Sequence, residues 1–210
     1  MNSNIILIMF CCSLNYLSST NCKQNAELYL ENPYTPVYDI IHNNTPRINL
    51  NIPDYLLLLS KISIVIKYLS IILLLEDDVY GKFIIKFNRE IICLIYSFLL
   101  RGITTRLTII PTCMPKPNIE KKTIYDNISI IIGYTHDLMY SGHTIMFIFL
   151  GKMIEENYNS NIFLYLSGNM IQFIFPLSII LARQHYTIDV VVAMIVYNFF
   201  NFGLNRNCDC

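Results

Sequence analysis

Charged side chains are scarce in this sequence. Of its 210 residues, only 14% are Asp, Glu, Lys or Arg and 54% are hydrophobic, whereas about a quarter of an average soluble domain is charged. This is too little charge to cover a surface in water, so the composition predicts a polytopic membrane protein. We expect one all-α domain over residues 1–210, with room for about six transmembrane helices in one bundle at about 20 residues per crossing.

Basic clusters and metal-like cysteine spacings are also lacking. The net charge is zero, and no cluster of Lys and Arg is interleaved with aromatic residues, which argues against a nucleic-acid partner. The seven cysteines do not show the spacing of a metal site. We therefore expect neither a metal ion nor another cofactor.

The first apolar run, residues 5–17, has no positive charge before it and no clear small-residue cleavage site after it. A signal peptide normally has both a positive charge before the apolar run and a small-residue cleavage site after it. Because both are missing, we expect an uncleaved first helix, with a signal peptide as the alternative. Polar or proline-containing loops are predicted at 20–52 and 111–140. The other predicted spans are 55–75, 91–110, 141–154, 162–182 and 188–202, with a kink at Pro176.

Two short motifs, Ser141-Gly142-His143-Thr144 and His185-Tyr186-Thr187-Ile188-Asp189, flank about forty mostly apolar residues. That length suffices for one helix across a bilayer and a second helix back, which returns His185 to the membrane face that His143 left. His185 and Asp189 are four residues apart, so on a helix they share one side. The sequence thus predicts a phosphoryl-transfer site at one membrane surface.

The predicted roles follow from the chemistry of these side chains. Asp189 would fix the tautomer of His185, the nucleophile toward a phosphodiester. His143 would protonate the departing alkoxide and then deprotonate the incoming hydroxyl. Gly142 gives the backbone freedom for a close turn. Groups expected to bind the phosphate oxygens are the side chains of Ser141, Thr144, Arg101 and Arg183.

Two further features place polar groups beside apolar sequence. Arg101 lies within a predicted span, where a charge is costly enough to suggest a purpose such as phosphate binding, with interfacial anchoring as the alternative. The segment 36–42 holds Asp39 and His42 beside apolar residues. We interpret it as an interfacial segment, with a contribution to a lipid site as the alternative.

The motifs resemble those of one enzyme family. The stretch Asp137–Thr144 resembles the third signature motif of the sphingomyelin synthases, and His185–Ala193 resembles their fourth. Residues 100–111 resemble the end of their third span, and residues 36–46 are a looser match to their first motif. The similarity therefore extends in order over most of the chain.

The resemblance implies six transmembrane helices in the Golgi or plasma membrane, with the active site on the lumenal or exoplasmic face. It implies transfer of a phospho-head group, phosphocholine first of all, from a glycerophospholipid to ceramide, with release of diacylglycerol. His143, His185 and Asp189 match the catalytic triad by position. Asp137 and Tyr186 lie in the same motifs and are candidate substrate contacts.

Several alternatives stay open. Arg183, in Ala182-Arg183-Gln184-His185, is more similar to the inositolphosphorylceramide synthases of plants and protozoa, so phosphatidylinositol and phosphatidylethanolamine are alternative donors. A phospholipase C-like hydrolase is a rival, although the Lys-x6-Arg-Pro motif usual in lipid phosphate phosphatases is lacking. A non-enzymatic lipid sensor and a homo-oligomeric assembly are further alternatives. Two N-glycosylation sequons, at 43–45 and 127–129, fall on the predicted active-site side.

Overall fold

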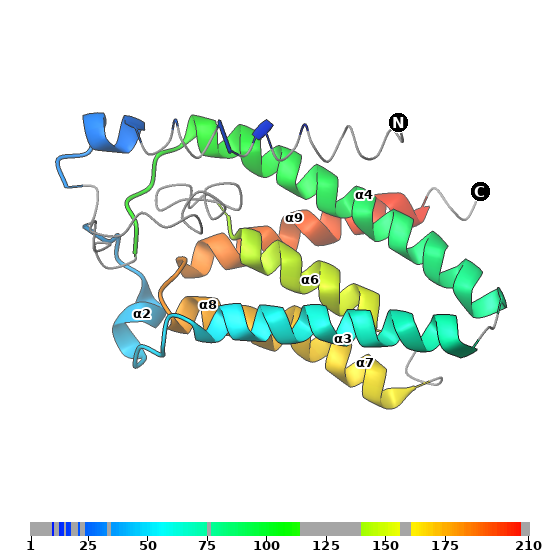
Figure 1. Ribbon diagram of the computed structural model, residues 1–210. Coiled ribbons are helices and arrows are strands. Elements are labelled where there is room, and N and C mark those ends of the chain that lie inside the picture. Colours follow the sequence, from blue (N-terminus) through cyan, green and yellow to red (C-terminus); the bar gives the residue numbers. More distant parts are fainter. Residues whose placement is uncertain are drawn as a thin grey trace.

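Helices make up the regular structure of the described chain (Figure 1). The computed structural model describes residues 24–32, 35–74, 77–113, 140–155 and 161–206, and a few isolated residues before 24. The prediction of an all-α protein is confirmed for these residues, which contain no strand. The elements are α2 (Ile40–Asn44), α3 (Ile52–Leu74), α4 (Asp77–Leu107), α6 (Gly142–Ile154), α7 (Ile162–Asn169), the π-helix η1 (Met170–Ile174), α8 (Phe175–Leu181) and α9 (Thr187–Arg206).

Two stretches in the described residues are long and apolar enough to cross a membrane: Ile162–Leu181, which combines α7, η1 and α8, and Thr187–Leu204 in α9. They support a membrane protein. The apolar helix α6 has 13 residues and is therefore about 20 Å long, less than the roughly 30 Å of a hydrocarbon core. The first predicted helix, residues 5–17, lies largely outside the described residues, and the number of six crossings stays a prediction.

The sequence misplaced one helix start and missed two short helical segments in the predicted loop 20–52. The span expected from residue 91 belongs to α4, which begins at Asp77, because the charged stretch before residue 91 contains no proline and its long side chains can extend away from apolar surface. The expected loop 20–52 contains helical residues at 24–29 and the helix α2. Asp39 caps this helix, because its Oδ1 accepts hydrogen bonds from the N–H groups of Ile41 and His42.

The proline in the 162–181 stretch coincides with an irregularity. The π-helix η1 ends at Ile174, two residues before Pro176. Proline has no N–H to donate and crowds the preceding turn, and a π-bulge is one way in which a helix absorbs such a disturbance.

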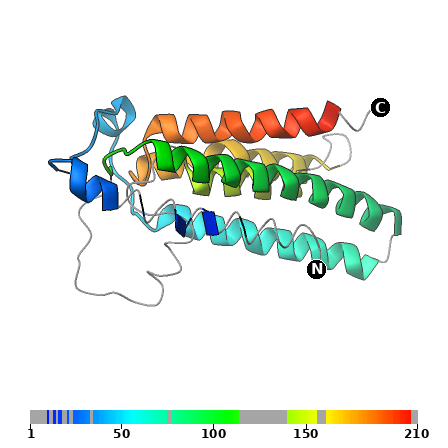
Figure 2. The same ribbon diagram turned by 90° about the horizontal axis from the view of Figure 1, so that it is seen from above.

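Helix α6 lies at the centre of the bundle. It contacts α3, α4, α7, η1, α8 and α9, and most of its side chains are buried. Its backbone approaches α7 closely: a Cβ added at Gly151 would lie 2.6 Å from the Gly168 carbonyl oxygen, and one at Gly168 would lie 2.7 Å from Glu155 Cα. Only glycine fits such a contact. Figure 2 shows α3 and α9 on opposite sides of the bundle.

A buried polar cluster fixes α9 against α4. Glu90 is fully buried, and its carboxylate accepts hydrogen bonds from Asn201 Nδ2 at 2.9 and 3.0 Å and from the Tyr197 hydroxyl at 2.9 Å. Arg89 Nη2 lies 3.0 Å from the same carboxylate. Buried hydrogen-bonded groups of this kind restrict how two helices can slide past each other. The cluster therefore fixes the position of α9 relative to α4.

Candidate active site

The beginnings of α6 and α9 meet at one end of the bundle, beside α2 and the end of α8 (Figure 1). Ser141 is the N-cap of α6, and its hydroxyl accepts from Thr144 N at 3.2 Å. Its own N–H donates to the Asp189 carbonyl oxygen at 3.1 Å. The two predicted motifs are therefore joined directly, which places His143, in the first turn of α6, at the same end as His185.

His185 and Asp189 form a buried pair. His185 Nδ1 lies 3.5 Å from Asp189 Oδ2, and the two residues are 7% and 1% exposed. The local structure differs from the expected helical pair, because α9 begins at Thr187 and His185 lies in the turn before it. Asp189 folds back instead, and its Oδ2 accepts from Tyr186 N at 3.0 Å. This is the geometry of an acidic residue that caps its own helix.

His143 has a partner that the sequence analysis did not find. Its Nε2 lies 3.2 Å from Oδ1 of Asp54, in the first turn of α3. A carboxylate can only accept, so His143 Nε2 carries the proton in this pair. Asp54 stands at a helix start, where an acidic residue is common because it interacts favourably with the helix dipole. It is also 89 residues from His143. Nothing in the sequence therefore indicated the contact between Asp54 and His143.

Arg101 is buried behind the start of α6. It is 2% exposed, and its Nε donates to the Tyr140 carbonyl oxygen at 3.1 Å. Arg101 thus contacts the residue that precedes Ser141. Gly142 and Thr144 are buried, and the Thr144 hydroxyl has no hydrogen-bond partner among the described residues. Asp137 lies outside the described residues.

Arg183 has an unusual backbone and a long-range contact. Its φ is 59°, in the left-handed region that favours glycine, and this turns the chain between α8 and α9. Its Nη2 donates to the His42 carbonyl oxygen at 2.8 Å, and its own carbonyl oxygen accepts from Cys113 Sγ at 3.2 Å. Burial, and then the charge of Asp189, raise the pKa of Cys113 to about 12, so the thiol keeps the proton that it donates.

The segment around α2 holds the beginning of α9. Asp39 Oδ2 accepts from Thr187 N at 2.7 Å, and Asp39 Oδ1 accepts from the Thr187 hydroxyl at 2.9 Å. His42 Nε2 donates to the His185 carbonyl oxygen at 3.1 Å, and its ring stacks on Tyr186. The sequence predicted an interfacial segment here. The structure places it against both residues that flank Tyr186.

We expect the Asp39 contacts to give an acid-sensitive contribution to stability. Burial opposes ionisation of Asp39, but hydrogen bonds from Thr187 and His42 outweigh it and lower its pKa. Because the pKa is lower in the folded protein, ionised Asp39 stabilises the folded state at any pH above about 4, the usual pKa of Asp. This contribution is lost as the pH falls through the folded-state pKa. Asp39→Asn should remove about 2 kcal/mol at pH 7, or about 4–8 °C in Tm.

The measurement is Tm against pH for wild-type protein and Asp39→Asn in detergent. The gap should be largest at neutral pH, begin to shrink as the pH falls below about 4, and close once the pH is below the lowered folded-state pKa, where Asp39 is protonated in the folded protein. Tyr38→Phe, a change at an exposed neighbour, is the matched control and should show no gap. An equal gap at pH 3 and pH 7 would contradict the assignment.

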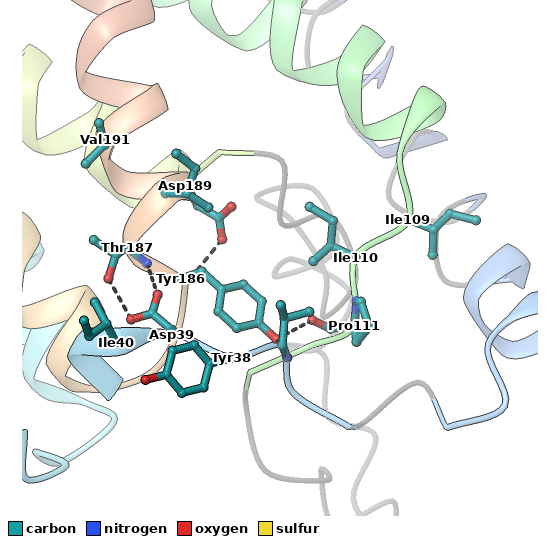
Figure 3. A pocket seen from close by; sticks show the side chains of 12 residues that line it. Tyr38, Asp39, Ile40, Ile109, Ile110, Pro111, Tyr186, Thr187, Asp189 and Val191 are labelled. Atoms are coloured by element: carbon teal, nitrogen blue, oxygen red, sulfur yellow. Dashed lines mark hydrogen bonds between the residues drawn. The ribbon is translucent and has the colours of Figure 1, made fainter. Parts of the chain in front are cut away.

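A pocket of about 650 Å³ opens beside the contact between Asp39 and Thr187 (Figure 3). Three segments form its walls: residues 37–40, residues 109–111, and residues 186–189 with Val191 at the start of α9. The Tyr186 hydroxyl joins two of these walls, because it accepts from Val37 N at 2.7 Å and donates to the Pro111 carbonyl oxygen at 3.0 Å. Burial raises the pKa of Tyr186 to about 12, so the hydroxyl keeps its proton and makes both bonds.

The described residues contain no group of three or more His, Cys, Asp or Glu side chains placed to hold a metal ion. What the arrangement offers is acid, base and nucleophile chemistry from two imidazoles, each beside a carboxylate.

Residues 136–205 match a family model described as the C-terminal part of the PAP2 superfamily. The matched segment contains both motifs and the helices α6 to α9. No curated protein matches the chain. The match supports the lipid phosphate phosphatase superfamily, and with it an enzyme of the lipid phosphatase or phosphotransferase kind, but it does not single out the sphingomyelin synthases.

Proposed function

We propose that this protein transfers a phospho-head group, phosphocholine first of all, from a glycerophospholipid to ceramide and releases diacylglycerol. The observation that carries the proposal is the hydrogen bond between Ser141 N and Asp189 O. It joins the segment that carries His143 to the His185–Asp189 pair, and this is the set of residues that resembles the sphingomyelin synthase motifs. Phosphatidylinositol and phosphatidylethanolamine are the alternative donors.

In the first half-reaction His185 acts as the nucleophile. Its Nδ1 faces Asp189, which leaves Nε2 to attack the phosphorus of the donor. A P–N bond forms as the P–O bond to diacylglycerol breaks, and His143 gives a proton to the departing oxygen. Asp189 stabilises the positive charge that develops on the ring. The 3.5 Å separation is longer than a hydrogen bond, and such contacts commonly shorten when substrate binds.

In the second half-reaction the acceptor takes the group. His143, now neutral, removes the proton from the acceptor hydroxyl, and the oxygen attacks the phosphorus. The P–N bond breaks and His185 is restored. Because Asp54 accepts from His143 Nε2, Nδ1 is the ring atom left for both proton transfers.

Asp54 should therefore act as a positioning residue for His143. We expect Asp54→Asn to lower kcat by about 10- to 100-fold, less than the roughly 10²- to 10⁴-fold that a complete acid–base group supplies, with little change in KM. Tyr55→Phe, at the next and exposed residue of α3, is the matched control. A kcat within twofold of wild type for Asp54→Asn would show that the contact does not serve catalysis.

The proposal includes six crossings and a lumenal or exoplasmic active site. Asn43, the acceptor of the first sequon, is exposed on α2 at the site end of the bundle. In a secretory-pathway membrane we expect a glycan at Asn43, seen as a mass shift that glycosidase removes and that Asn43→Gln abolishes. An unmodified Asn43 in protein whose other sequon is glycosylated would place this end of the bundle elsewhere.

The test of the reaction uses purified full-length protein in liposomes with labelled short-chain ceramide. Phosphatidylcholine, phosphatidylinositol and phosphatidylethanolamine are offered one at a time. A ceramide-linked product from one donor identifies the reaction. Diacylglycerol without such a product would indicate a hydrolase, the second candidate, with which the superfamily match is equally compatible. No product from any donor, in folded protein, would leave the sensor hypothesis.

A further inference from the structure

The pocket beside α9 runs from exposed apolar side chains to a buried carboxylate. At its mouth Tyr38, Ile40 and Ile188 are 76%, 64% and 61% exposed, whereas Asp189 at its inner end is 1% exposed. Figure 3 shows the Asp189 carboxylate on the side of α9 that faces Ile110. An apolar mouth of this kind suits an apolar ligand, and pockets of about 300–1,000 Å³ are the size that holds a small ligand.

One oxygen of Asp189 lacks a partner. Oδ2 accepts from Tyr186 N and faces His185 Nδ1, but the buried Oδ1 makes no hydrogen bond to any described residue. A buried acceptor without a donor destabilises the folded protein, because the atom has lost its hydrogen bonds to water without replacing them. Such an atom is a place for a donor that arrives with a ligand, because that donor would recover this cost.

The charges of the lining favour a neutral ligand. The charged side chains among the lining residues are Asp39 and Asp189, and the lining contains no Lys, Arg or His in the described part of the chain. Two carboxylates repel a phosphate and accept from a hydroxyl or an amide N–H. A phosphate-bearing lipid is therefore the wrong chemistry for the inner end of this pocket.

We propose that the pocket binds the hydrocarbon chain of a neutral lipid alcohol, whose hydroxyl or amide group donates to Asp189 Oδ1. This inference rests on the proposed function, in which the acceptor ceramide and the product diacylglycerol are both neutral lipid alcohols. The pocket is then the acceptor side of the site, and the phosphate of the donor binds elsewhere around His185. The Tyr186 hydroxyl sets the width of the pocket, because it ties residue 37 to residue 111.

The test is photo-crosslinking in liposomes, which needs no turnover. The probe is a ceramide with a diazirine in its acyl chain, offered to the full-length protein, and the labelled peptides are mapped by mass spectrometry. Val191→Trp fills the pocket from α9. Ile195→Trp, one turn further along the same exposed face of α9 and outside the lining, is the matched control. Both variants are first shown to have the Tm of the wild type.

We expect labels on residues 109–113 and 186–191, reduced about tenfold by Val191→Trp and unchanged by Ile195→Trp, as steric exclusion from an apolar pocket predicts. Unlabelled ceramide or diacylglycerol should compete, and whichever competes better is the resident lipid, whereas phosphatidylcholine should not. Labels spread evenly over α3 and α9, labels that Val191→Trp leaves unchanged, or equal competition by phosphatidylcholine would overturn the inference. Absence of head-group transfer with this labelling pattern intact would overturn the proposed function alone.

Discussion

Replacing His185 by Ala should lower kcat for head-group transfer by at least about 10⁴-fold, because removal of a nucleophile or its base from a catalytic unit costs about that much or more. Tm should change little. The His185 side chain is mostly buried, but the hydrogen bond that links His185 to α2 uses its carbonyl oxygen, which accepts from His42 Nε2. Ser141, in the 140–144 segment, donates instead to the Asp189 carbonyl oxygen.

The measurement is the initial rate of ceramide-product formation in liposomes, with Asn198→Ala as the control. Asn198 is exposed on α9, and its side chain donates to Met194 O of the same helix, so its loss should leave the rate unchanged. A covalent adduct between the phospho-head group and the protein, trapped at early times in the wild type, should be absent from His185→Ala. Retention of more than a tenth of the rate would exclude His185 as the nucleophile.

Asp189→Asn should lower kcat by about 10³- to 10⁴-fold, as expected when the anionic partner of a catalytic histidine is neutralised. The amide oxygen can still accept from Tyr186 N, as Asp189 Oδ2 does, so the start of α9 should stay intact. The loss is then one of charge beside His185 Nδ1, which lies 3.5 Å away.

Asp189→Ala separates the charge from the cap. It removes both the charge and the hydrogen bond to Tyr186 N, so it should lower Tm as well as kcat, whereas Asp189→Asn should lower kcat with a smaller change in Tm. Equal rates for wild type and Asp189→Asn would show that the carboxylate only caps α9. The comparison is made by rate and Tm on the same preparations.

The predictable part of this fold is its class and the pairing of its motifs. Low charge and long apolar runs predicted helices, and helices are what the described residues form. The spacing of His185 and Asp189 predicted a pair, and the pair exists, although a helix-capping turn rather than one helix face brings it together. A spacing of four residues is compatible with both. The Asp189 cap and the long-range contacts of Asp39 and His42 together hold the start of α9.

The unpredictable part consists of contacts between residues far apart in the chain. Arg101 was expected to bind phosphate, and the structure shows its Nε on the Tyr140 carbonyl oxygen, which no pattern in a single sequence indicates. Asp54 was missed for the same reason. The phosphate-binding roles of Arg101 and Arg183 stay predictions.

The hydroxyl of Tyr186 also bears on the order in which the protein assembles. Its partner Val37 is 149 residues earlier in the chain, and the partner of Thr187, Asp39, is 148 residues earlier. Contacts so distant in sequence cannot form until both segments have been synthesised. The segments that precede residue 186 must therefore wait with this end of the bundle incomplete. A nascent chain that stops before residue 186 has two of the pocket's three walls and lacks the Tyr186 hydroxyl that joins them.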